Sequence, residues 1–264
     1  MDDATSGQVS GDGAELYERF FVPALFGQWP PRLLDLAGVT VGDDVLDVGC
    51  GTGVVAREAL RRVGRAGRVV GVDVNGPMLA VAALAEPRVT WLHAAAESLP
   101  VGDASVDAVV CQFAAMFFAD RSSAFAEMRR VSRPGGRVVV ATWAALHETP
   151  GYAAMVGLVR EVVGDDAASA LEAPFVMGRP EQLRAEVSEV FDHVDVHRLD
   201  GQALFPSIDA WVDTDVRAWT LRDLVDDAAL AALHDAARSR LARLCDDSGR
   251  VRFPAPALVA LAEA

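Results

Sequence analysis

Three glycines at alternate positions follow a short apolar run and precede a helical pattern: Gly49, Gly51 and Gly53. Such glycines let the chain turn sharply after a strand and let a ligand lie against bare backbone. The free amides of the following helix point back at the same place. Asp73 ends the next apolar run, where a carboxylate can accept two ribose hydroxyl hydrogen bonds, each worth roughly 1.5–3 kcal/mol. The spacing predicts a nucleoside-binding turn.

The same turn discriminates between nucleoside cofactors. A dinucleotide fingerprint places its third glycine where this chain has Val54, so the pattern does not match one. Asp47 stands at the end of the preceding run, where it would repel a diphosphate but not a positively charged aminoacyl group. NAD and FAD are therefore disfavoured. S-adenosylmethionine (SAM), which carries a ribose, an α-ammonium and a sulfonium, fits these residues.

Composition sets the class of protein. The chain has 264 residues, of which 52% are hydrophobic and 23% charged, enough to bury a sizeable core. Its 24 basic residues, all arginine, face 38 acidic ones, and the net charge of −14 repels a phosphate backbone. We therefore expect a small-molecule substrate and no nucleic acid. The lysine-free, Ala-, Val- and Gly-rich composition is typical of a GC-rich genome such as that of an actinobacterium.

Other classes find no support in the pattern. No apolar run reaches the roughly 18 residues of a membrane span, and the polar start contains no signal-peptide core. We expect a cytoplasmic protein without a membrane partner. The three cysteines and five histidines show no metal-ligand spacing, so no metal is expected. The oligomeric state stays open, with a homodimer among the alternatives.

Short apolar runs alternate with helical stretches after residue 44, which predicts a parallel sheet covered on both faces. The expected strands are 44–48, 68–72, 89–92, 106–111 and 136–143. The expected helices between them are 54–63, 77–85 and 122–131. Further on, helices are expected at 152–163, 180–191, 208–224 and 228–244, and strands at 194–199 and 256–262, the last antiparallel at an edge.

This pattern predicts one domain over residues 1–264. It comprises an N-terminal helical cap (1–38), a cofactor-binding core (44–143), substrate-side helical insertions with a sixth strand (144–250) and a last strand (256–262). Two or three short helices are expected in the cap. The helices within 208–244 are expected to cover the acceptor pocket.

Four segments in order resemble the class I SAM-dependent methyltransferases, especially the ubiquinone/menaquinone-type and bacterial small-molecule branch. They are VLDVGCGTG, VVGVDVNGPML, AAAESLPVGDASVDAVVCQF and MRRVSRPGGRVVVATW, and the likeness covers residues 17–143 well. The resemblance implies an α/β, Rossmann-like, mostly parallel seven-stranded sheet with an antiparallel edge strand. It also implies that eleven residues bind SAM: Tyr17, Asp47, Gly49, Gly51, Gly53, Asp73, Val74, Met78, Ala96, Glu97 and Gln112.

Their implied roles divide between the two ends of the cofactor. Gly49 and Gly51 would face the methionine part, with Asp47 near its ammonium. Gln112 would contact the methionyl or sulfonium side, and Tyr17 would close over the cofactor.

At the adenine end, Val74 and Met78 would flank the ring, and Ala96 would offer its backbone beside Glu97. Ala95 stands where the family commonly has Asp. The usual acceptor for the adenine amino group is therefore missing unless Glu97 replaces it.

Two sets of residues bear on the acceptor. His147 directly follows the fifth expected strand, on the ligand-binding side of such sheets, so it is a candidate general base if the acceptor is a hydroxyl; the alternative is a solvated pair with Glu148. Several aromatic residues could either line an acceptor pocket or fill the core. They are Trp29, Phe117, Phe118, Trp143, Trp211 and Trp219.

The sequence thus predicts methyl transfer from SAM to a small, largely apolar metabolite by in-line displacement. Orientation alone can contribute on the order of 7–11 kcal/mol, so a dedicated base is not required. Two alternatives stay open: an enzyme of the same fold that binds SAM but catalyses a non-methylating reaction, and a silent SAM-binding protein.

Overall fold

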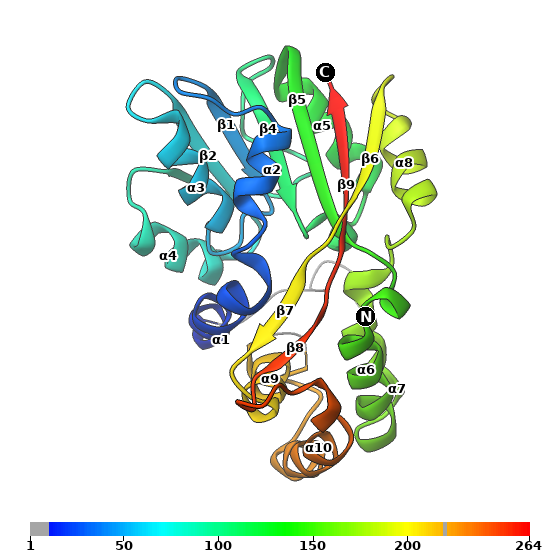
Figure 1. The fold of residues 1–264 in the computed structure, drawn as a ribbon. Helices are drawn as coiled ribbons and strands as arrows, with labels where there is room; N and C mark the ends of the chain where they lie inside the picture. Colours follow the sequence, from blue (N-terminus) through cyan, green and yellow to red (C-terminus); the bar gives the residue numbers. More distant parts are fainter. Residues whose placement is uncertain (1–10, 219–220) are drawn as a thin grey trace.

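The computed structural model describes residues 11–218 and 221–264. Its centre is a seven-stranded sheet in the order β3-β2-β1-β4-β5-β9-β6, in which β9 alone runs antiparallel to its neighbours (Figure 1). The predicted Rossmann-like sheet is therefore present. Its strands are β1 (Asp44–Val48), β2 (Arg68–Asp73), β3 (Thr90–His93), β4 (Val106–Gln112), β5 (Ser132–Trp143), β6 (Val194–Leu199) and β9 (Ala257–Glu263).

The sequence predicts the antiparallel strand at an edge of the sheet, and this position is wrong. Strand β9 pairs with β5 on one side and with β6 on the other, so β6 is the edge strand. The burial of the two strands gives the physical reason. Five of the seven residues of β9 are buried, as expected for a strand covered on all sides, whereas only one of the six residues of β6 is buried, as expected at the limit of a sheet.

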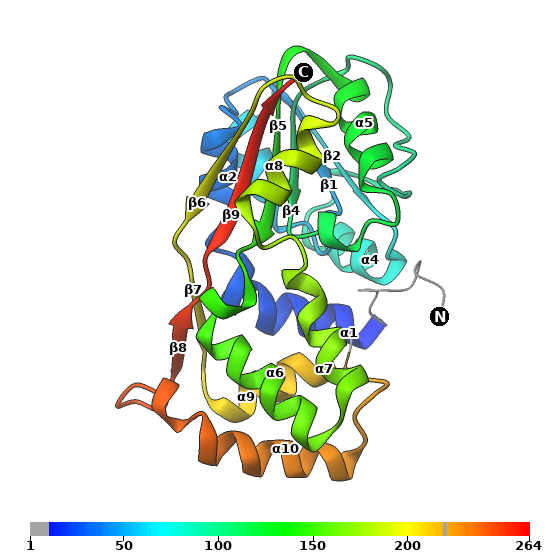
Figure 2. The same cartoon turned by 90° about the vertical axis from the view of Figure 1, so that its right-hand side faces the viewer.

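Helices cover both faces of the sheet. In Figure 2 the sheet is seen nearly edge-on, with α2 on one side and α5 and α8 on the other. The helices that follow the parallel strands begin and end close to the predicted residues. They are α3 (Val54–Val63), α4 (Gly76–Ala85) and α5 (Arg121–Val131). The other two covering helices are α2 (Pro30–Leu36), which precedes β1, and α8 (Pro180–Ser188), which precedes β6 and ends three residues before its predicted end.

The remaining helices form a lobe beyond the carboxyl ends of the parallel strands (Figures 1 and 2). The helices are α1 (Gly11–Leu16), the π-helix η2 (Tyr17–Phe26), α6 (Pro150–Val162), α7 (Asp165–Glu172), α9 (Ile208–Arg217) and α10 (Asp227–Arg240). Short 3₁₀ turns connect several elements. They are η3 (Ala115–Phe117), η4 (Leu146–Glu148), η5 (Ala173–Phe175) and η6 (Ala242–Leu244).

A two-stranded ribbon that the sequence does not predict joins the sheet to this lobe. It pairs β7 (Gln202–Phe205) with β8 (Val251–Pro254), and its strands extend β6 and β9. At the junction the amide of Ala255 donates to the carbonyl of Gly201 at 2.9 Å. A Cβ on Gly201 would lie 2.3 Å from the ring of Trp29, so glycine is required for this close packing.

Among the described residues, none of the helices combines the length and apolarity that crossing a bilayer requires. In the same part of the chain, His, Cys, Asp and Glu side chains form no group of three or more that could hold a metal ion.

Candidate functional site

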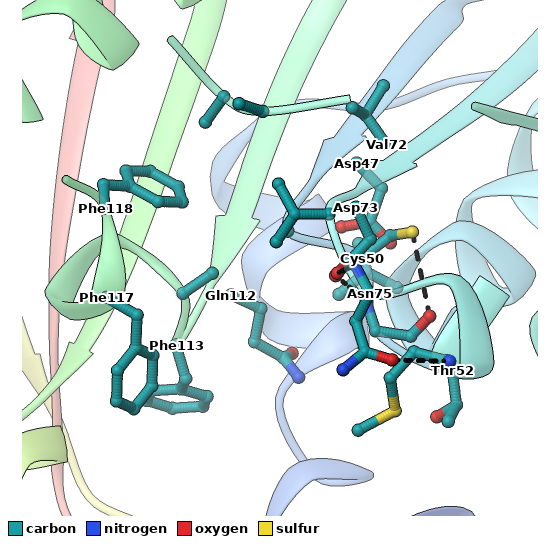
Figure 3. A pocket seen from close by; sticks show the side chains of 18 of the residues that line it. Asp47, Cys50, Thr52, Val72, Asp73, Asn75, Gln112, Phe113, Phe117 and Phe118 are labelled. Carbon is teal, nitrogen blue, oxygen red and sulfur yellow. Dashed lines mark hydrogen bonds between the residues drawn. The ribbon is translucent and has the colours of Figure 1, made fainter. Parts of the chain in front are cut away.

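A cavity of about 250 Å³ opens at the carboxyl ends of β1, β2 and β4, where the glycine turn and η2 meet. Ten of the eleven predicted cofactor residues line it, and Gly53 does not. Figure 3 shows its two walls: Asp47, Cys50, Thr52, Asp73 and Asn75 on one side, and Phe113, Phe117 and Phe118 on the other. The cavity therefore has a polar wall and an aromatic wall.

The three glycines of the turn all adopt left-handed backbone conformations, with φ of 66°, 53° and 83° at Gly49, Gly51 and Gly53. They differ in what surrounds them. A Cβ on Gly49 would lie 2.3 Å from the Cβ of Ala114, and one on Gly53 would lie 2.3 Å from the ring of Trp91. No atom lies within 4 Å of a Cβ on Gly51. Gly53 thus serves the start of α3, whereas Gly51 offers free space to a ligand.

Asp47 ends β1 beneath this turn and is 1% exposed. Its Oδ2 accepts a hydrogen bond from the amide of Ala56 at 2.9 Å, and its Oδ1 is buried without a partner. Burial raises the pKa of Asp47 to about 7, against the lowering effect of the Ala56 amide. A buried carboxylate oxygen without a donor is costly, and an ammonium group in the cavity would satisfy it.

Asp73 ends β2 and is anchored by two backbone amides. Its Oδ2 accepts from Gly51 at 2.7 Å and its Oδ1 from Asn75 at 2.8 Å. Burial raises the pKa of Asp73, although these amide bonds act in the opposite direction. A carboxylate has about four lone-pair sites, so each oxygen can still accept a ribose hydroxyl.

The residues predicted to contact the adenine all line the cavity, beyond the carboxyl ends of β2 and β3. They are Val74, Met78, Ala96 and Glu97. Asn75 caps α4 by accepting a hydrogen bond from the amide of Met78 at 3.0 Å. This cap places the Met78 side chain in the wall.

Ala95 also lines the cavity, in the position where the family commonly has Asp. Glu97 supplies a carboxylate at this end. Its Oε1 accepts from the amide of Asp120 at 3.2 Å, which ties Glu97 to the start of α5. The position of Glu97 is compatible with replacing the missing acid.

Two stacked pairs of aromatic rings also line the cavity, and one of them includes Phe113 of the aromatic wall. Tyr17 stacks on Phe26 with ring centroids 5.1 Å apart, and Phe113 stacks on Trp143 at 3.9 Å with 8° between the planes. Phe113 has a φ of 54°, a conformation that is strained for a bulky residue and that concentrates at functional sites. Gln112 precedes it, and its Oε1 is buried without a partner. Figure 3 places the Gln112 amide between the two walls.

Thr52 is a cavity residue that the sequence reasoning missed. It is 1% exposed, and its buried hydroxyl has no hydrogen-bond partner. Asn75 and Phe113 were also missed as cavity residues. The signal for Thr52 was present, because it stands between two glycines of the turn. Phe113 could not be assigned from sequence, because only its unusual backbone directs the ring to this wall.

His147 is not brought to the cavity. It lies exposed in η4, a turn that leads the chain from β5 towards α6, and it does not line the cavity. Its neighbour Glu148 pairs with Arg198 at 3.0 Å.

The predicted aromatic set divides between cavity and core. Phe117, Phe118 and Trp143 line the cavity, whereas Trp29 and Trp211 are completely buried in the core. Trp219 lies outside the described residues.

The helices within 208–244 lie on the carboxyl side of the sheet, as α9, α10 and η6 (Figure 1). They do not line the cavity. Within the helical lobe, the cavity residues come from η2 and are Tyr17 and Phe26.

Comparison with known proteins agrees with this geometry. A family model described as a methyltransferase domain matches residues 46–140. The ubiquinone/menaquinone biosynthesis C-methyltransferase UbiE of Pseudomonas paraeruginosa is 32% identical over 190 residues, which cover 66% of this chain and 74% of that protein. This chain belongs to the class I SAM-dependent methyltransferases. The UbiE of Hahella chejuensis is 38% identical over 118 residues, 42% of this chain, and the match spans about half, 47%, of that relative.

Solved structures of this fold extend the likeness to most of the methyltransferase chain. A Haemonchus contortus phosphoethanolamine N-methyltransferase 2, in complex with phosphomonomethylethanolamine and S-adenosylhomocysteine (SAH), has a TM-score of 0.61 at 20% identity and covers 96% of this chain and 57% of its own. The [4+2]-cyclase SpnF has a TM-score of 0.56 at 18% identity and covers 90% of this chain and 81% of its own.

The cofactor of this methyltransferase is SAM, and the residues present fit it. The unpartnered Oδ1 of Asp47 meets the need of an ammonium, and the space beside Gly51 admits the ligand. When bound, SAM supplies an electrophilic methyl group on a sulfonium.

Proposed function

We propose that this chain transfers the methyl group of SAM to a small-molecule acceptor held at the aromatic wall, by in-line displacement at the sulfonium. The observation that carries the proposal is the division of one cavity into a polar wall with two acids and an aromatic wall with none. The polar wall suits ribose and ammonium groups. The aromatic wall suits a largely apolar acceptor, because ring faces bury apolar surface.

The chain's own residues would position the reactants. Asp47 would hold the ammonium, Asp73 the ribose hydroxyls, and Gln112 would offer its free Oε1 to a donor group where the walls meet. At the aromatic wall, the described residues include no carboxylate or imidazole. We therefore propose that transfer proceeds by proximity and orientation, without a general base from the protein.

The cysteines support a proposal about the cellular compartment. All three are free thiols, which is typical of a reducing compartment. We propose a cytoplasmic enzyme on this basis. The lysine-free composition supports an actinobacterial source, although the two relatives compared above are from Hahella and Pseudomonas.

The test uses SAM with an isotopically labelled methyl group and a bacterial extract separated into a low-molecular-mass fraction and a macromolecular fraction. We expect label in a compound of the first fraction, whose mass spectrum identifies the acceptor atom. The variant Asp73→Ala serves as the binding-deficient control. Label in protein or nucleic acid would contradict the proposal.

A non-methylating reaction is the second candidate, because the fold neighbour SpnF is a [4+2]-cyclase. It would convert a compound of the extract while the label stays in SAM. If SAH binds and neither labelling nor conversion occurs, the chain is a silent cofactor-binding protein.

A further inference from the structure

The N-terminal segment Gly11–Phe26, made of α1 and η2, lies against the mouth of the cavity. We call it the lid. Tyr17 of the lid lines the cavity, and Ala14 packs in a buried contact with Met78, itself a cavity residue of α4. Tyr17 and Val81 pack against this pair. Movement of the lid would therefore open the cavity beside Met78.

One ion pair fastens the lid to the glycine turn. Glu18 follows Tyr17, and its Oε1 accepts a hydrogen bond from Nη2 of Arg57 on α3 at 2.7 Å. Nη1 of Arg57 donates to the backbone carbonyl of Thr52 at 2.8 Å. A single guanidinium thus holds the lid with one nitrogen and the cofactor turn with another.

The surroundings make this pair stronger than an ordinary surface pair. The side chains of Arg57 and Glu18 are only 21% and 29% exposed. The second oxygen of Glu18 is buried and has no partner, so loss of Arg57 would leave the carboxylate half-buried and unpaired. Such a state favours an open lid, in which water can reach the carboxylate.

We propose that the Glu18–Arg57 pair is a latch that sets how fast SAM enters and SAH leaves. Neither residue lines the cavity, so they are positioning residues and act through Tyr17 and the turn. A latch that is closed both with and without ligand changes the rates of entry and exit together and leaves the equilibrium almost unchanged. A residue that binds the ligand directly changes the dissociation rate alone.

The experiment is stopped-flow measurement of SAH association and dissociation in the full chain. In Glu18→Gln we expect both rate constants to rise about three- to tenfold while Kd stays within about threefold, given the strength of partly exposed pairs. Arg57→Lys should behave similarly, because an ammonium cannot reproduce the fixed fork that serves Glu18 and Thr52.

The matched control is Arg62→Gln. Arg62 lies on the same helix and pairs with Asp35 at 2.5 Å, but neither residue lines the cavity or belongs to the lid. Its SAH rates should stay unchanged. Unchanged rates in a folded Glu18→Gln variant would overturn the proposal, and so would a faster dissociation rate with an unchanged association rate. These outcomes concern SAH alone, so they are independent of the acceptor.

Discussion

The carboxylate of Asp73 and the backbone amide of Gly51 are joined by a hydrogen bond of 2.7 Å across 22 residues of sequence. The acid that we propose to hold the ribose hydroxyls therefore also fixes the glycine turn. A substitution at Asp73 would therefore alter both the ribose contacts and the glycine turn. We expect Asp73 to affect cofactor binding more than any other single residue.

Asp73→Ala should weaken SAH binding by about 30- to 1,000-fold, or roughly 2–4 kcal/mol, because two charge-assisted hydrogen bonds are lost. Isothermal titration calorimetry measures the change, and the exposed Asp35→Asn is the control. Unchanged affinity in Asp73→Ala would refute the assignment. Binding of NADH by the original chain would contradict it as well.

Asp47 should link cofactor affinity to pH. Its pKa is about 7 in the unliganded protein, and only its ionised form attracts an ammonium. We therefore expect SAH affinity to fall as the pH drops from 8 to 6. Asp47→Asn should bind SAH weakly at both pH values and lose this dependence. A dependence that persists in Asp47→Asn would assign it to another group.

The same residue should oppose folding stability at alkaline pH. Burial raises the pKa of Asp47 from its ordinary value of 3.8 to about 7 in the folded chain, so the folded state binds the extra proton and stability falls as pH rises between these values. At pH 8 the penalty is about 4 kcal/mol at 1.36 kcal/mol per pKa unit. Asp47→Asn should therefore raise the Tm of the unliganded protein more at pH 8 than at pH 5. An equal Tm change at both values would exclude this linkage.

Gly51 and Gly53 should respond differently to alanine. In Gly51→Ala the added methyl meets no protein atom, so stability should fall by only about 1–2 kcal/mol from the left-handed backbone while SAH affinity falls sharply. In Gly53→Ala the methyl would lie 2.3 Å from the Trp91 ring, so folding itself should suffer. Urea unfolding and SAH titration of both variants separate the two roles. Equal stability losses would contradict the distinction.

His147→Ala should lower kcat by less than about tenfold, because the side chain is exposed and outside the cavity. A general base would cost about 10²- to 10⁴-fold. Turnover of the acceptor identified by methyl labelling decides between these values. A large loss with unchanged SAH affinity would mean that His147 reaches the acceptor by a movement of η4.

The parallel core was predictable because strands that are buried on both faces have nearly continuous apolar sequences. A short apolar run predicted β1 and helical periodicity predicted α3, both to the residue. Four in-order motifs located the residues of the polar wall. The sequence of β9 is a continuous apolar run, whereas β6 mixes apolar with polar residues. This difference indicates that β9 is internal, but the predicted edge position did not take it into account.

Other features were hidden because no local pattern encodes them. The strands β7 and β8 have four residues each and pair across some fifty residues of chain. The assignment of Phe117 to the cavity and of Trp29 to the core depends on which neighbour each ring meets. Residues of one chemical type thus divide between two environments that only tertiary contacts define.

The internal position of β9 has a consequence for synthesis. Strand β6 ends at Leu199, and its partner begins at Ala257. While the intervening residues are being made, β5 presents an unpaired edge and β6 lacks its only strand partner in the sheet. Unpaired strands invite pairing with other chains. A ribosome that pauses within this stretch would thus expose the β5 edge of an incomplete sheet. The seven-residue strand β9 must be made before this edge is covered and aggregation through it is prevented.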